Sequence, residues 1–145
     1  MKRKIICLVS ILLLTALVSF SSYAENITLD TMLRKLGDRN VTSLKKVELI
    51  DSYKGQVVKG AGKVRDVVKS FGSENTALVY IRKPYQGKLY EIILTVDQQS
   101  AENIKKGRNI AFEGKFAGMT FETLRLEEGK ITGSGGMGWF GWWPF

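Results

Sequence analysis

The hydrophobic pattern changes its period near Gln56, and this change constrains the fold more than any other feature of the sequence. Before this point, apolar residues recur every three or four positions, as in helices. After it, apolar and polar residues alternate, as in strands with one buried face. The alternation predicts five strands, at residues 56–68, 76–82, 88–96, 108–116 and 121–126, the last of which Lys130-Ile131 can extend. A polar, helical stretch at residues 97–106 separates the third strand from the fourth, so the order is β-β-β-α-β-β.

Two short helices are expected before the strands. The first has a single apolar stripe, formed by Leu29, Met32, Leu33 and Leu36. Either Thr28 or Asp30 can cap it. The second helix is predicted to start at Ser43, with the side chains of Leu44, Val47 and Ile50 facing the core.

Five short strands with one helix between the third and the fourth favour a mainly β fold, a five-stranded OB-type Greek-key barrel. Gly60 and Gly62 interrupt the first strand, where a missing Cβ permits a bulge or a sharp coil. Residues 83–87 and 117–120 are predicted to form hairpin loops. The side chains predicted to face inward are Val58, Val64, Val79, Ile81, Tyr90, Ile92, Leu94, Val96, Ile110, Phe112 and Phe116, with Gly60, Gly62 and Gly114 between them. A β-sandwich is the competing fold, but five strands in a chain of this length suit a closed barrel better.

Two stretches carry a resemblance to a known family. They are Ser43-Leu44 through Tyr53-Lys54-Gly55-Gln56-Val57-Val58 and Gly62-Lys63-Val64-Arg65-Asp66-Val67, and then Ile104-Lys105-Lys106-Gly107-Arg108-Asn109-Ile110-Ala111-Phe112-Glu113-Gly114-Lys115. This pattern resembles bacterial exported OB-fold domains grouped as tRNA-anticodon-binding-like, over residues 43–132. The resemblance implies the barrel architecture, because its motifs mark a fold and not an activity. This chain has Gly60 where many relatives have a bulky residue.

Residues 1–24 are predicted to be a cleaved signal peptide. Lys2, Arg3 and Lys4 form a basic start, an apolar run follows at residues 5–20, and small residues precede a cut after Ala24. The apolar run is shorter than the roughly 18–20 residues that span a bilayer, so cleavage is preferred over retention as an anchor. The protein is therefore expected to be periplasmic or secreted.

The sequence has no histidine, and its one cysteine, Cys7, lies in the export segment. The exported chain would therefore lack disulfides, metal sites built on Cys or His, and nucleophilic triads that use histidine. We predict no metal, no cofactor and no catalytic residue, so the protein is not expected to be an enzyme. A hydrolase that uses carboxylates is the remaining enzymatic alternative.

One group of side chains is a candidate ligand site. The formal net charge of the whole chain is +8, to which the export segment contributes three basic residues. On the predicted barrel, the outward residues of the first two strands include Lys59, Lys63, Arg65, Tyr80 and Arg82. Four cations around one aromatic ring suit an anionic polymer, whose charges meet the cations while the ring stacks. The alternative is an ordinary solvated face, on which lysine blunts aggregation.

Residues 133–145 are predicted to form a flexible Gly/Trp-rich tail. Its aromatic residues are Trp139, Phe140, Trp142, Trp143 and Phe145. Indole rings favour membrane interfaces and aromatic-lined grooves, so docking on a partner or a membrane surface is expected, with packing back on the barrel as the alternative.

The predicted organisation is a signal peptide at 1–24, an N-terminal helix and linker at 25–42, an OB-fold domain at 43–132 and the tail at 133–145. The expected function is that of an exported, non-enzymatic binding module of the cell envelope. Its ligand is expected to be anionic or an envelope protein, and export argues against nucleic acid. The alternative is a structural or interaction protein that works through its aromatic tail.

Overall fold

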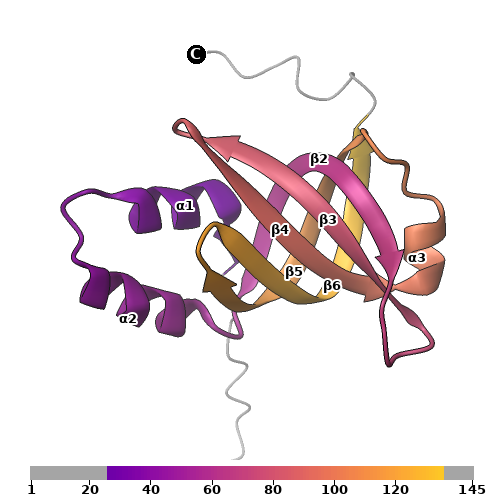
Figure 1. The fold of residues 1–145 in the computed structure, drawn as a ribbon, viewed down its shortest axis with the longest axis horizontal. Coiled ribbons are helices and arrows are strands. Elements are labelled where there is room, and N and C mark those ends of the chain that lie inside the picture. The colour runs from indigo at the N-terminus through magenta and orange to yellow at the C-terminus, as the bar shows by residue number, and fades with distance from the viewer. Residues whose placement is uncertain (1–25, 136–145) are drawn as a thin grey trace, which may run out of the picture.

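Helices give way to sheet where the periodicity of the sequence changes. The computed structural model describes residues 26–135. Its elements, in chain order, are β1 (Ile27–Thr28), α1 (Leu29–Gly37), α2 (Ser43–Tyr53), β2 (Val57–Lys69), β3 (Thr76–Tyr85), β4 (Lys88–Asp97), α3 (Gln98–Glu102), β5 (Asn109–Thr120) and β6 (Thr123–Gly135). Figure 1 shows α1 and α2 together at one end of the sheet and α3 at the other.

The sheet closes on itself through β2, which pairs with two different strands. Its first half pairs with β5 and its second half with β3, and Lys63 takes part in both pairings. Strands β3 and β4 form an antiparallel hairpin, β4 lies parallel to β6, and β6 returns antiparallel to β5. The five strands β2 to β6 therefore form the predicted OB-type barrel, with α3 between the third and fourth barrel strands. Sequence analysis missed the short strand β1, which adds to β2 in parallel.

The barrel interior contains the side chains that the alternation assigned to it. Every inward residue predicted on the four strands is buried, and Leu124 and Leu126 on β6 complete the core. The predicted stripe of α1 is also buried, at Leu29, Met32, Leu33 and Leu36. The cap of α1 is Thr28, whose Oγ1 accepts a hydrogen bond from the Thr31 backbone N–H at 3.3 Å. The core thus joins the first helix to the barrel.

Of the bulge and the sharp coil that Gly60 and Gly62 were predicted to permit, the bulge does not form at these residues, where β2 pairs in register with β5 up to Lys63 and there changes partner to β3. The register of β2 shifts further along the strand, between Val64 and Asp66. The two glycines instead allow a close approach of other elements. A Cβ at Gly60 would lie 2.9 Å from the Cβ of Leu29, and a Cβ at Gly62 would lie 2.5 Å from Cγ2 of Ile81. Leu29 of α1 therefore occupies the volume that a bulky residue at position 60 would need.

The prediction that α2 turns Leu44 and Val47 inward is wrong. Leu44 is 72% exposed and Val47 is 56% exposed, whereas Ile50 is partly buried and Tyr53 is buried. The reason is that the barrel holds only the end of this helix: just after it, the backbone N–H of Gly55 donates to the carbonyl of Phe116 on β5, at 2.8 Å. The first turn of α2 lies away from the barrel (Figure 1).

The strands are longer and their connections tighter than predicted. The β3–β4 turn consists of Gln86 and Gly87, and β5 meets β6 at Phe121 and Glu122, so both predicted loops lie largely within strands. Positive φ angles at Gln86 (47°), Gly87 (77°) and Phe121 (53°) provide the sharp reversals. Strand β6 continues to Gly135, three residues into the predicted tail, and α3 ends at Glu102 instead of residue 106.

The predicted signal peptide, its cut after Ala24, and the tail residues Trp139, Phe140, Trp142, Trp143 and Phe145 lie outside the described residues. Within residues 26–135, the helices are too short or too polar to cross a membrane.

Candidate functional site

Four of the five predicted ligand residues come together on the outer surface of the barrel. We call this surface the β3–β4 face; its side chains are Leu78, Tyr80 and Arg82 of β3, Glu91 and Ile93 of β4, and Lys63 and Arg65 of β2. Lys63 lies opposite Arg82 in the strand register, and the Arg65 guanidinium lies over the Tyr80 ring, 5.4 Å from its centroid. Lys59 does not join them, because its part of β2 pairs with β5 instead of β3.

Carboxylates offset part of the charge that the sequence suggested. Glu91 of β4 forms an ion pair with Arg65 at 2.8 Å, and Glu113 of β5 lies 3.7 Å from Lys59. Within the described part of the chain, Lys63 and Arg82 have no ion-pair partner. The face is therefore less basic than its three cations suggest, and Lys63 and Arg82 are the charges available to a ligand. The alternation of residues 88–96 already placed Glu91 outward, so this partner was detectable in the sequence.

A row of half-exposed apolar side chains crosses the middle of the face. Leu78, Tyr80 and Ile93 are each intermediate in exposure, between inward neighbours that are buried. Leu78 lies opposite Val68 of β2, which is 37% exposed, and Tyr80 lies opposite Ile93. A ring and aliphatic surface held on rigid strands can stack against planar or cyclic units of a ligand.

Exposed phenylalanines lie in the two loops that border this face. Phe71, fully exposed, belongs to the β2–β3 connection, and Phe121, 89% exposed, belongs to the β5–β6 turn. The backbone N–H of Glu91 donates to the Glu122 carbonyl at 2.9 Å, which places that turn beside β4 at the level of Arg82. Figure 1 shows the β2–β3 connection at the α3 end and the β5–β6 hairpin toward α1 and α2. The seven residues from Thr76 to Arg82 span about 20 Å of strand between the loops.

Sequence analysis did not single out these two phenylalanines. Phe71 precedes Gly72, whose φ of 90° marks a turn, and Phe121 itself occupies a two-residue turn. An aromatic residue at a turn has no neighbouring strand to cover it. A phenylalanine in or beside a predicted turn was therefore the sequence signal that could have indicated that both rings are exposed. In OB folds, the second and third barrel strands and the loops corresponding to these two bind oligonucleotides and oligosaccharides; here those strands are β3 and β4.

The pKa values of two groups near the ends of β4 are displaced. Burial raises the pKa of Tyr90, with smaller contributions from the Glu122 carboxylate and from Tyr85. Hydrogen bonds from Ser100 lower the pKa of Asp97, which caps α3. Neither side chain belongs to the β3–β4 face. No cluster of His, Cys, Asp or Glu suited to a metal ion occurs in the described residues. The chemistry that the face offers is stacking and charge recognition.

The comparisons with known proteins concern the fold. No family model matches the sequence, and no curated protein matches it. Among solved structures, the chain is similar to a crystal structure described as a "putative nucleic acid-binding lipoprotein" from Klebsiella pneumoniae. The TM-score is 0.55 and the identity 15%, over 75% of this chain and 92% of that one. This likeness supports the barrel architecture.

A second similar structure is asparaginyl-tRNA synthetase of Entamoeba histolytica in complex with asparaginyl-adenylate. The TM-score is 0.34 and the identity 12%, over 58% of this chain and 22% of the synthetase.

Proposed function

We propose that the protein is an exported, non-enzymatic OB-fold module of the cell envelope that binds an extended anionic polymer across the β3–β4 face. The observation that carries the proposal is the pair of exposed rings, Phe71 and Phe121, at the two borders of a face with Tyr80 at its centre. Rings at both ends of an apolar row extend the surface on which an elongated ligand can stack.

The charges of the face suit a weakly anionic ligand. Lys63 and Arg82 lie opposite each other and have no ion-pair partner among residues 26–135, so both can meet phosphate, sulfate or carboxylate groups. Arg65 is already occupied by Glu91 and by the Tyr80 ring. Stacking on Tyr80, together with two charge contacts, favours a polymer whose cyclic units alternate with anionic groups.

Two considerations bear on the class of polymer. The name of the Klebsiella protein combines nucleic-acid binding with a lipoprotein, which supports an OB-type binding face and an envelope location for this chain. The predicted signal peptide favours an acidic polysaccharide of the envelope over nucleic acid. We therefore expect binding to an oligouronate, with single-stranded DNA as the comparison ligand.

The test is a titration of fluorescently labelled oligouronate and oligothymidylate at low salt. In the double variant Lys63→Gln/Arg82→Gln, we expect about tenfold weaker binding of the preferred polymer, since a charge-assisted contact contributes about 1 kcal/mol or more. The salt dependence should also become flatter. The double variant Lys105→Gln/Arg108→Gln, with the same charge change at the α3 end, is the matched control.

Tyr80→Ala tests the stacking contribution and should also weaken binding, by about fivefold or more. Equal affinities in the wild type and in both face variants would contradict the proposal. Tighter binding of oligothymidylate than of oligouronate would keep the face and change the class of polymer.

A further inference from the structure

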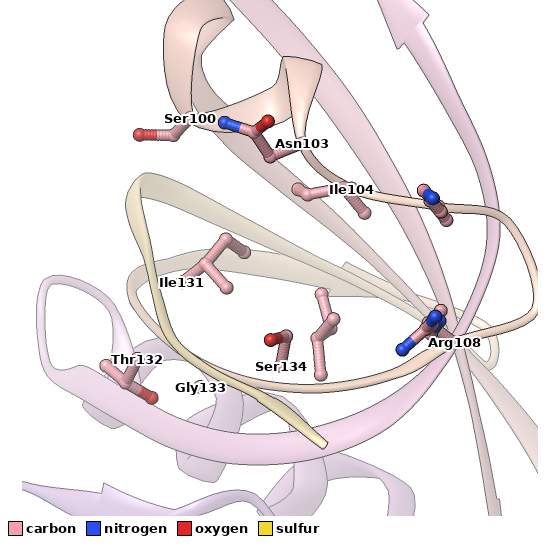
Figure 2. A pocket seen from close by; sticks show the side chains of 10 residues that line it. Ser100, Asn103, Ile104, Arg108, Ile131, Thr132, Gly133 and Ser134 are labelled. Carbon is pink, nitrogen blue, oxygen red and sulfur yellow. The ribbon is translucent and has the colours of Figure 1, made fainter. Parts of the chain in front are cut away.

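Apart from the β3–β4 face, a concave region lies at the α3 end of the barrel, away from α1 and α2. It is a pocket of about 430 Å³ between α3 and the loop after it on one side and the end of β6 on the other. Figure 2 shows Ser100 and Asn103 on the α3 side, Ile131 to Ser134 on β6, and Arg108 at one edge. The volume is within the range of sites for small ligands, about 300–1,000 Å³.

The floor of the pocket is apolar. Ile110 of β5 is buried, and Ile104 and Ile131 are partly buried against the core. These three side chains come from three different elements, so the surface they form is part of the folded barrel. Helix α3 ends at Glu102, one turn after it begins, and the loop after it contributes Ile104 to the lining opposite Ile131.

The rim of the pocket is basic, and no carboxylate of the described residues pairs with its cations. Lys105 and Arg108 line the pocket, whereas no carboxylate does. Neither cation forms an ion pair with another described residue. The nearby Asp97 is engaged with Ser100, whose backbone N–H and Oγ donate to it at 2.8 and 2.5 Å. This differs from the β3–β4 face, where Glu91 holds Arg65.

We propose that this pocket binds a small amphipathic anion, with its apolar or planar body on the three isoleucines and its anionic group between Lys105 and Arg108. Burial of the body against Ile104, Ile110 and Ile131 provides the apolar contribution. Two cationic donors at the rim can form charge-assisted hydrogen bonds to a carboxylate, sulfonate or phosphate. Asn103 lies at the same rim and offers a further donor. This site is separate from the polymer face and does not depend on the proposed function.

The experiment uses a pair of fluorescent probes with the same aromatic body. One is 1-anilinonaphthalene-8-sulfonate, which carries one negative charge, and the other is the uncharged N-phenyl-1-naphthylamine. Both are titrated into the folded full-length chain, and the dissociation constant and stoichiometry are measured. We expect one anionic probe per chain. Lys105→Gln/Arg108→Gln should weaken binding of the anionic probe about tenfold, since 1.4 kcal/mol corresponds to a factor of ten, and that of the neutral probe less than about twofold.

Two further variants distinguish binding in this pocket from nonspecific binding of the probes elsewhere on the protein surface. Ile131→Ala should weaken both probes, by about fivefold, because it removes apolar contact area from the floor. Arg39→Gln/Lys46→Gln removes the same charge from residues near α1 and α2, away from both sites, and should leave both titrations unchanged. Equal losses in the two double variants, or anionic-probe binding that survives Lys105→Gln/Arg108→Gln, would overturn the proposal.

Discussion

The β3–β4 face and the α3 pocket both contain cations and apolar side chains, but they arrange them in opposite ways. On the face, Arg65 pairs with Glu91, and the apolar row lies on an open sheet. Outside the face, on the first half of β2, Lys59 pairs with Glu113. In the pocket, Lys105 and Arg108 lie above a concave apolar floor, and no carboxylate is among the lining residues. The comparison shows that the number of basic residues in a segment does not give the local charge. Strand pairing decides it, because Glu91 and Glu113 come from other strands.

The largest effect is expected from a substitution at Gly62, which contacts residues of both regions. Gly62 pairs with Ile110 of the pocket floor, and the side on which it lacks a side chain lies close against Ile81 of the core and the backbone carbonyl of Arg82. Gly62→Ala would place a Cβ 2.5 Å from Ile81 Cγ2 and 2.9 Å from the Arg82 oxygen. We expect the free energy of unfolding to fall by about 2 kcal/mol, measured by urea denaturation, with weaker binding at both sites.

Gly133→Ala is the control for that prediction, since its Cβ would meet Ala111 at 3.7 Å, an ordinary contact. Its stability should change by no more than about 0.5 kcal/mol. If the two alanine variants had the same free energy of unfolding, the close packing at Gly62 would not contribute to the stability of the barrel.

A smaller effect is expected from removing a carboxylate that pairs with a cation, so that the cations of the face, like those of the pocket, have no ion-pair partner within residues 26–135. Glu91→Gln releases Arg65 on the face, so it should strengthen binding of the anionic polymer at low salt, by about threefold. Glu113→Gln releases Lys59, which lies outside the face, and should change the polymer affinity less. The anionic probe of the pocket should bind as before. Glu48→Gln, which removes a carboxylate from α2, controls for the change in net charge. An unchanged polymer affinity in Glu91→Gln would show that this carboxylate does not limit binding at the face.

The smallest effect concerns the wall of the pocket, because α3 is held by a titratable cap. Ser100 lowers the pKa of Asp97 in the folded state, so the cap stabilises the fold fully above the ordinary pKa of aspartate. That stabilisation is lost as the pH falls through the lowered value. Asn caps helices about as well as Asp and does not titrate. Between about pH 6 and about pH 3, the wild type should therefore lose more stability to urea than Asp97→Asn. Parallel losses would mean that the Asp97–Ser100 hydrogen bonds do not stabilise α3.

The interior of the barrel was predictable because burial imposes a strict pattern on each strand. Side chains alternate in a strand, so Val79 and Ile81, or Ile92 and Leu94, reveal the inward face without knowledge of the partner strand. The same reasoning failed at α2, where Leu44 and Val47 have helical spacing but the elements within residues 26–135 leave both side chains mostly exposed. Periodicity shows which residues share a face of a helix, and not whether that face is covered.

The candidate sites depend on relations that a single sequence does not contain. Lys63, Tyr80 and Arg82 were predictable because they lie on adjacent strands whose outward positions follow from the alternation. The separation of Lys59 from them was not, since it results from the change of partner along β2. The pocket could not be predicted either, because Ile104 and Ile131 approach each other only once β6 has returned beside α3.

The double pairing of β2 also determines when the barrel can form during folding. Val57 pairs with Lys115 and Lys63 with Asn109, so the barrel closes only after segments about 50 residues apart have met. Such distant contacts slow folding relative to local ones. Until β5 arrives, the first half of β2 presents unpaired backbone groups along one side, a template for association between chains. A chain that stops before residue 109 should therefore aggregate, whereas the complete barrel covers that edge from within.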